Sequence, residues 1–106
     1  MIIPQTVEKI GNYCFSGMIS LKNIIITPSI TSIPNHCFNG CVLLKSITIP
    51  QTVTSFGEYS FCECESLQQI QIPSCVTFIG NHCFSGCKSI KEITIPQSVT
   101  KINEYC

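Results

Sequence analysis

The sequence predicts a repeat solenoid, a fold in which the chain winds into stacked coils of equal length. Three observations predict this fold class. Apolar positions recur every 23 residues, each unit contains a short strand-like stretch, and proline and glycine follow that stretch at fixed places. A period between about 20 and 50 residues indicates a stacked array of similar units. The 106 residues therefore form one domain, 1–106, of about four and a half units.

Seven columns of residues spaced 23 apart are expected to form the core, because every member is apolar or contains sulfur. The clearest column consists of Phe15, Phe38, Phe61 and Phe84. The other six columns begin at Ile3, Val7, Ile10, Met18, Leu21 and Ile24. If successive units lie on top of one another, like side chains form continuous stripes in the interior.

Each unit opens with the pattern L-x-x-I-x-I, which predicts a short strand. Ile47 and Ile49 alternate with Thr48, so the isoleucines are expected to point inward and the threonine outward. Proline then ends the strand, as at Pro50, because it has no N–H group to donate to a ladder. The second unit has its proline one place later, at Pro28, where we expect a small kink without a break.

A turn is expected in the second half of each unit. Glycine at positions 11, 57 and 80 permits a tight turn. Polar residues such as Asn12 follow and suit the start of a short helical or 3₁₀ segment. From that segment, the phenylalanine and the cysteine three residues later face the core.

The stretch "LKSITIPQTVTSFGEYSFCECESL" and its sister segments resemble the BspA-type leucine-rich repeat family over the whole chain. The resemblance implies an α/β-type leucine-rich repeat: a curved, right-handed coil with one short parallel sheet on the concave face. Turns or short 3₁₀ or helical segments would lie on the convex face. It also implies roles in adhesion and protein–protein contact, often at cell surfaces. The family places core residues at the cysteine of F-x-x-C and at the small residue before phenylalanine. This chain departs by placing cysteine at the small position too, at Cys14, Cys37, Cys83 and Cys106.

The segments "NHCFNGC" (35–41) and "NHCFSGC" (81–87) raise the question of a metal site, because zinc binds histidine and cysteine. The two segments lie two coils apart, about 10 Å, so no single ion bridges them. Neighbouring His36 and Cys37 are expected to point in different directions. Tyr13, Tyr59 and Tyr105 fill the histidine column elsewhere. We therefore expect exposed turn histidines, with no metal and no cofactor.

Nine cysteines are interpreted as free thiols, because no secretory signal is visible at the N-terminus. Stacked cysteines such as Cys41 and Cys64 fall within the Cα separation that a disulfide allows, about 4.4 to 6.8 Å. Their side chains run parallel, however, and closing the bond would strain the coil. Cys62 and Cys75 fall in columns that otherwise hold Ser, Asn or Thr, so we expect both to be exposed.

The composition argues against several classes of function. Arginine is absent, which argues against a nucleic-acid partner. Aspartate is absent and the glutamates are scattered, which argues against a pair of catalytic carboxylates. No glycine loop for phosphate occurs, and no apolar run approaches the ~20 residues of a membrane helix. We expect neither an enzyme nor membrane insertion.

Two surfaces are candidates for binding protein partners. The first is the row of outward strand positions, a polar strip that otherwise is merely a solvated sheet face. Its residues are Lys22, Asn23, Ile25, Lys45, Ser46, Thr48, Gln68, Gln69, Gln71, Lys91, Glu92 and Thr94. The second is an apolar patch before the strands, which otherwise packs locally against a neighbouring loop. Its residues are Ile19, Val42 and Leu43.

The chain begins and ends within a unit, without a polar capping coil. Because uncapped coils expose core side chains and strand edges, we expect a homo-oligomer formed through the solenoid ends. The leading hypothesis is a non-catalytic, self-associating protein-interaction module. The alternatives are a fragment of a cell-surface adhesin and, less favoured, a thiol-redox or metal protein. The missing signal and free cysteines favour the cytoplasm, whereas the family resemblance favours the cell surface.

Overall fold

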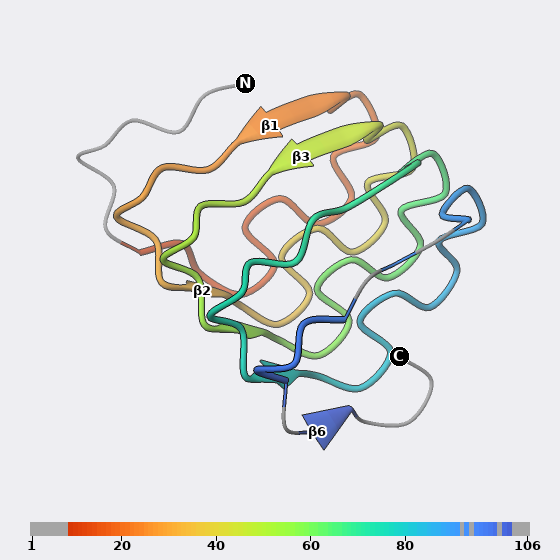
Figure 1. Cartoon of the computed structure of the whole chain (residues 1–106). Helices are drawn as coiled ribbons and strands as arrows, with labels where there is room; N and C mark the ends of the chain where they lie inside the picture. Colours follow the sequence, from red (N-terminus) through yellow and green to blue (C-terminus); the bar gives the residue numbers. More distant parts are fainter. Residues whose placement is uncertain (1–8, 92, 94, 100, 103–106) are drawn as a thin grey trace.

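The computed structural model describes residues 9–91, 93, 95–99 and 101–102, and it forms the stack of coils that the sequence predicts. Strand β1 (Asn23–Ile25) pairs in parallel with β3 (Ser46–Thr48), and both lie side by side at the top of Figure 1. Their partners are 23 residues apart, for example Ile24 and Ile47. The predicted solenoid with short parallel strands is therefore confirmed.

A second sheet runs along another side of the stack, toward the bottom of Figure 1. It has four parallel strands in the order β2-β4-β5-β6, and each is paired with the equivalent residues of the next coil. The strands are β2 (Ser32–Ile33), β4 (Ser55–Phe56), β5 (Phe78–Ile79) and β6 (Lys101–Ile102). The expectation of one sheet is thus wrong, because the coils form two sheets, of which the first holds β1 and β3 and the second holds the other four strands.

Close approach of neighbouring coils explains the glycines that follow this second sheet. A Cβ atom added to Gly57 would collide with Oδ1 of Asn35 and would lie 2.6 Å from the backbone nitrogen of the same residue. At Gly80 it would lie 2.5 Å from the backbone nitrogen of Glu58. Neither glycine has a positive φ angle. Glycine is therefore required at these two positions by the close packing of neighbouring coils, and not by the tight turn that the sequence predicted.

The remaining side of each coil is built from turns, and the described residues contain no α-helix or 3₁₀ helix there. In the second coil, the N–H groups of His36, Phe38 and Gly40 donate to carbonyls of the next coil at 2.9, 2.8 and 2.9 Å. Between them, the N–H groups of Cys37 and Asn39 donate to carbonyls three residues earlier in their own coil, each at 3.3 Å. Turn bonds and coil-to-coil bonds therefore alternate along the backbone, so both sets of N–H groups are satisfied.

The second unit keeps its length although its proline is displaced to Pro28. Thr27 takes the place that Pro50 has in the next unit and is buried. Its carbonyl accepts the N–H of Ile30 at 3.1 Å, matching the bond from Val53 to Pro50 at 3.2 Å. The Thr27 hydroxyl also accepts the N–H of Ser29 at 3.2 Å. The coil continues without a break, as expected.

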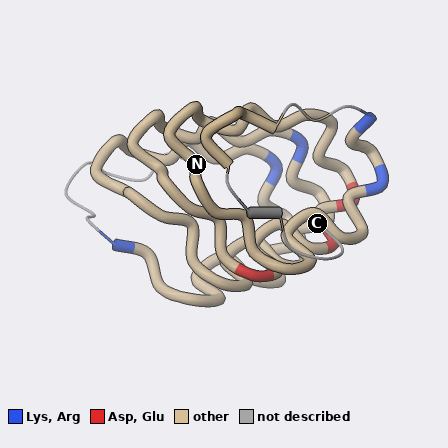
Figure 2. The backbone as a smooth tube through the Cα atoms, turned by 60° about the horizontal axis from the view of Figure 1, so that its bottom comes forward, with Lys and Arg blue, Asp and Glu red and all other residues tan. Residues whose placement is uncertain are grey.

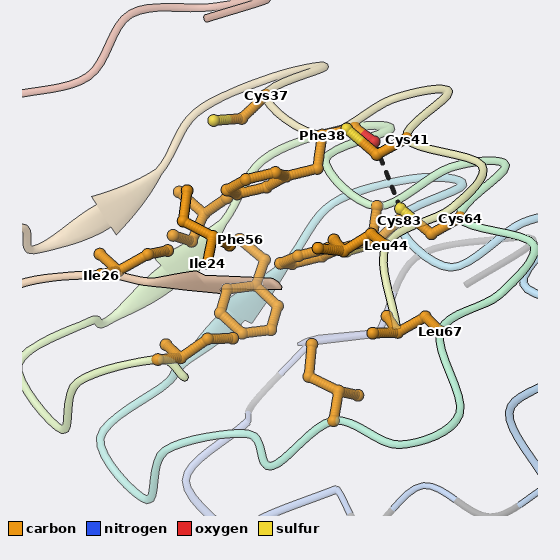
Figure 3. Close-up of a cluster of buried hydrophobic side chains, with 14 of the residues drawn as sticks. Ile24, Ile26, Cys37, Phe38, Cys41, Leu44, Phe56, Cys64, Leu67 and Cys83 are labelled. Carbon is orange, nitrogen blue, oxygen red and sulfur yellow. Dashed lines mark hydrogen bonds between the residues drawn. The ribbon is translucent and has the colours of Figure 1, made fainter. Parts of the chain in front are cut away.

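The phenylalanine column forms the spine of the core. Phe15, Phe38, Phe61 and Phe84 stack with ring centroids 5.3, 5.3 and 5.7 Å apart and nearly parallel planes. Phe56 packs edge-on against Phe61 at 5.5 Å. Figure 3 shows Phe38 and Phe56 in this cluster of buried side chains, with Leu44 and Leu67 beside them. The interior stripes predicted from the 23-residue period are confirmed.

Candidate functional site: a polar groove on the strand face

The polar strip predicted from the sequence lies on the side of the molecule that contains β1 and β3, which we call the strand face (residues 22–25, 45–48, 68–71 and 91). Every described member of the strip is exposed. Glu92 and Thr94 lie outside the described residues. The structure thus brings the other ten predicted residues onto one surface, and their role in binding remains a prediction.

Three adjoining hollows make a groove along the strand face. The largest has a volume of 740 Å³, and its polar lining residues are Gln51, Gln68, Gln69, Gln71, Ser74 and Lys91. A second hollow of 700 Å³ shares Gln68, Gln69 and Lys91 with it and adds Lys88 and Ser89. A third hollow of 440 Å³ shares Gln51, Gln69 and Gln71 and reaches Ser46 and Thr48 on β3. The shared walls make the three hollows one continuous polar groove.

The groove opens where the ladder of the first sheet ends. β1 pairs with β3, but residues 69–71 of the next coil are not paired with β3 as a strand. The same coils stay paired in the second sheet, through β4 and β5. In Figure 1 the third coil leaves the side of β3 while the coils remain close below. The coils therefore spread apart on the strand face, which leaves the space that the glutamines line.

Positive charge borders this groove. Lys22, Lys45 and Lys91 occupy one column with Gln68, and all are exposed. Among the described residues, none of these three lysines makes an ion pair; the ion pair present there joins Lys88 to Glu65 at 3.8 Å. Figure 2 shows lysines gathered along one side of the coil stack. No described residue that lines the groove is acidic.

The apolar patch predicted before the strands is present in part. Ile19 is 63% exposed and Leu43 is 43% exposed, whereas Val42 is half-buried. Ile19 and Val42 belong to one column of neighbouring coils, so their side chains lie over adjacent turns. The patch is small, and its role in binding remains a prediction.

An aromatic ladder that the sequence reasoning missed runs along the turns. Tyr13, His36, Tyr59 and His82 stack with centroids 4.5, 4.8 and 4.7 Å apart and planes within 9° of parallel. Each residue has a positive φ angle, between 56° and 63°. The side-chain amide nitrogen of Asn39 donates a hydrogen bond to Nδ1 of His36 at 2.9 Å. The histidines are half-buried, so the expectation of exposed histidines is wrong; alternation of His and Tyr at this period was the available signal.

The cysteines of F-x-x-C form hydrogen bonds that cross from coil to coil. The thiols of Cys41, Cys64 and Cys87 donate to the carbonyls of Phe15, Phe38 and Phe61 at 3.0, 3.2 and 3.0 Å. Figure 3 shows the bond that Cys64 makes. A small thiol suits this place because it fills the core and also satisfies a second lone pair of the carbonyl.

Burial is the main cause of the raised pKa values of the Cys37, Cys41 and Cys62 thiols. Burial, with a smaller contribution from neighbouring Cys14, raises the pKa of Cys37 from 9.0 to about 12. The hydrogen bond to the Cys87 sulfur, together with burial, raises the pKa of Cys64. Thiols with raised pKa values are poor nucleophiles at neutral pH, because the thiolate is the reactive form. The buried thiols of Cys37 and Cys64 therefore act as packing groups of the core.

Exposure of the other cysteines differs from expectation at two places. The eight described cysteines form no disulfide with one another, and Cys75 is exposed as expected. Cys62 is buried, because its column packs beneath the next turn, so the expectation that it is exposed is wrong. Cys14 is exposed although its column is internal elsewhere. The described residues contain no group of three or more possible metal ligands, and Cys106 lies outside them.

Two further observations concern the whole chain. In the described part of the chain, no helix has the length and apolarity needed to cross a membrane. The expected association through the solenoid ends falls on residues 1–8 and 103–106, which lie outside the described residues.

The model of the BspA-type leucine-rich repeat region matches residues 1–106. No curated protein matches the chain. Three solved structures of bacterial proteins are similar over most of it. The leucine-rich repeat protein of T. pallidum is 28% identical, with a TM-score of 0.91 over 95% of this chain and 50% of its own.

The other two similar structures are longer proteins. A leucine-rich repeat protein of Bacteroides ovatus ATCC 8483 is 36% identical, with a TM-score of 0.85 over 92% of this chain and 25% of its own. A leucine-rich cell surface protein of Faecalibacterium prausnitzii A2-165 is 33% identical, with a TM-score of 0.79 over 82% of this chain and 23% of its own. This chain spans half or less of the length of all three structures.

Proposed function

Because the chain belongs to the BspA-type leucine-rich repeat family, we propose that it is a non-catalytic module that binds a protein partner through the strand face. One observation carries the proposal. The described residues of the predicted strip are all exposed, and six of them line the continuous polar groove: Ser46, Thr48, Gln68, Gln69, Gln71 and Lys91.

The physical basis of the proposal is the contrast between the two sides of each strand. The inward side chains fill the core, and their burial stabilises the fold. The described outward side chains of the strand face are exposed to solvent and do not pack in the core. Solenoids commonly bind along such an extended surface, because every coil contributes equivalent positions to it. A partner would contact several coils at once.

Face-specific crosslinking tests this proposal. A photoreactive phenylalanine analogue replaces Gln71 in the groove, or Glu63 on the turn side as the matched control. We expect the Gln71 variant to form a covalent crosslink with one defined polypeptide when it is irradiated in the medium in which the source cell lives. Purified, that polypeptide is expected to bind the unlabelled protein and to lose binding to the double variant Q69A/Q71A. Equal capture from both faces, or unchanged binding by the double variant, would contradict the proposal.

A second proposal, that the chain is part of a cell-surface adhesin, is supported by the similar cell surface protein of F. prausnitzii. Labelling intact cells with a membrane-impermeant maleimide tests it, because Cys75 and Cys14 are exposed. The full-length protein at the cell surface is expected to be labelled without lysis. Labelling that occurs only after lysis would place the protein inside the cell and reject the adhesin.

A further inference from the structure

Among the described residues that line the groove, the charged side chains are all lysines. Lys91 lines the two larger hollows, Lys88 lines one of them, and Lys45 belongs to the same column as Lys91, with Gln68 between them. Of the described glutamates, Glu58 and Glu63 belong to the turns, and Glu65 is paired with Lys88. Among the described residues, Lys88 therefore has an acidic partner in Glu65, whereas Lys45 and Lys91 have none. A surface of this kind attracts a ligand that supplies the missing negative charge.

The floor of the groove adds hydrogen-bonding groups of a particular type. Gln68, Gln69 and Gln71 are exposed, and within the described residues their side-chain amides make no hydrogen bond. Each amide presents both a donor and an acceptor. A peptide backbone in extended conformation presents the same two groups at every residue. The row of glutamines is thus complementary to an extended chain of amides.

What lines the groove also limits the ligand. Its apolar lining residues are Ile47, Ile49, Ile70, Ile72 and Pro96, with no aromatic ring among the described lining residues. A sugar ring would find no aromatic face to pack against. A partner with large apolar anchors would find no deep pocket of the kind that hot spots use. The lining suits a polar, flexible and charged segment.

From these observations we infer that the groove binds an extended acidic peptide segment of the partner, with its carboxylates on the lysine column and its backbone on the glutamines. The inference rests on the proposed function, since it names the chemistry of the partner for that same surface. Carboxylates on alternate residues of an extended chain point to one side and recur about every 6.8 Å. Because Gln68 separates Lys45 from Lys91 in the column, such carboxylates reach these two lysines across the coil between them.

Fluorescence anisotropy with synthetic peptides tests the inference. The probe is a labelled twelve-residue peptide of alternating Glu and Ser, and the control peptide replaces each Glu with Gln. Binding is measured at low and at high salt, using the whole chain. We expect the acidic peptide to bind at least tenfold more tightly than the control, and salt to weaken it, because exposed charges are screened.

Charge-neutral variants locate the site. K45Q/K91Q is expected to weaken binding about fivefold, since each exposed pair contributes little by itself. Lys9→Gln, at an exposed lysine away from the groove, is the matched control and is expected to leave binding unchanged. Circular dichroism spectra and urea midpoints equal to those of the unsubstituted protein establish that both variants are folded.

Three outcomes overturn the inference in distinguishable ways. If both peptides bind equally and Q69A/Q71A weakens both, protein binding by the groove stands and the acidic preference is wrong. If neither peptide binds but a sulfated or uronic-acid polysaccharide does, with the same loss in K45Q/K91Q, the ligand is a glycan. If no probe binds and face-specific crosslinking also fails, the proposed function fails with the inference.

Discussion

Glu63 stands in a position where the equivalent residues of the other coils are glycines. Gly17, Gly40 and Gly86 have φ angles of 72°, 80° and 79°, and Glu63 has 61°. The left-handed conformation costs an L-residue about 1–2 kcal/mol, of which the extra flexibility of glycine in the unfolded chain offsets part. At this second left-handed position of the coils, Glu63 is the residue that has a side chain.

We expect Glu63→Gly to raise the free energy of unfolding by about 0.5–1 kcal/mol. Urea denaturation followed by circular dichroism measures the change. Glu63→Ala is the control, because it removes the carboxylate but keeps a Cβ atom in the left-handed conformation. An equal gain in both variants would show that charge, and not backbone strain, is responsible.

Cys37 makes stability depend on alkaline pH. Its pKa is raised from 9.0 to about 12 by burial, so the native state keeps the proton over a range in which the unfolded chain has lost it. The native state then binds more protons than the unfolded state, and stability falls as pH rises. This contribution is fully present below pH 9 and is lost between pH 9 and about 12.

We expect the free energy of unfolding to fall with a slope of up to about 1.4 kcal/mol per pH unit from this thiol alone. Cys37→Ser removes the titrating group, and serine is already accepted in this column, as buried Ser60 shows. Urea unfolding at pH 8, 9, 10 and 11 is therefore expected to give a shallower slope for the variant. Identical slopes for the two proteins would be inconsistent with this role.

Side-chain exposure was the property that the sequence predicted least well at single residues. Cys62 belongs to a column that otherwise holds Ser16, Asn39 and Ser85, so composition suggested exposure. The column is nevertheless covered, because the turns of successive coils lie against one another. Half-burial of His36 arises from the same cause, since its ring lies between two tyrosine rings. Stacking determines burial here, and a column's average polarity does not report it.

At the scale of the element, close coil packing makes the glycines that follow β4 and β5 indispensable. Alanine at position 57 would place its Cβ atom within 2.7 Å of the backbone of Pro34 and Asn35. Backbone atoms cannot move aside as a flexible side chain can. The two coils would have to separate, with loss of the bond from the Gly57 N–H to the Ile33 carbonyl at 2.7 Å.

We expect Gly57→Ala to lower the free energy of unfolding by about 2 kcal/mol or more. The matched control is Gly11→Ala in the same column, where an added Cβ atom has nothing within 4 Å. That variant is expected to be near neutral. Thermal unfolding of the two variants gives the comparison, and similar losses in both would point to helix or turn propensity in place of coil spacing.

The strand that opens each unit, and the residue at which it ends, could be predicted from the sequence, but the second sheet could not. L-x-x-I-x-I gives an alternation long enough to recognise, as at Ile47 and Ile49. The second sheet uses strands of two residues, such as Ser55–Phe56, which are too short for any alternation to appear. Hydrogen bonds to neighbouring coils create these strands, and the local sequence does not.

For the whole molecule, the phenylalanine spine links the stability of all coils. Phe61 is fully buried between Phe38 and Phe84, whereas Phe15 is partly exposed. In a solenoid each coil contacts only its neighbours, so a defect acts through the two adjoining interfaces. The cost of a cavity therefore depends on where in the stack it is made.

We expect Phe61→Leu to lower the free energy of unfolding by about 1–3 kcal/mol, and Phe15→Leu to cost less than half as much. Equilibrium denaturation gives both values, and native-state hydrogen exchange shows which amides lose protection. For Phe61→Leu, protection should fall in the coils on both sides. A loss of equal size in the two variants would mean that the spine does not transmit stability in this way.

The architecture of the whole was the most predictable level, because a 23-residue period repeats the same information several times over. The groove was predicted only as a row of outward side chains. Its depth comes from the point at which the first sheet ends, after β3, and no residue type marks that point. The polar character of the lining residues could therefore be predicted from the sequence, whereas the groove that they line could not.

The alternation of N–H groups in the turns has a consequence for how such proteins change length in evolution. A single inserted residue would send every later N–H group of that turn in the opposite direction, from its own coil to the neighbouring one or the reverse. A whole inserted unit changes none of these directions. Gain and loss of sequence should thus occur in multiples of the unit, which lets a gene lengthen by duplication while each turn keeps its bonding.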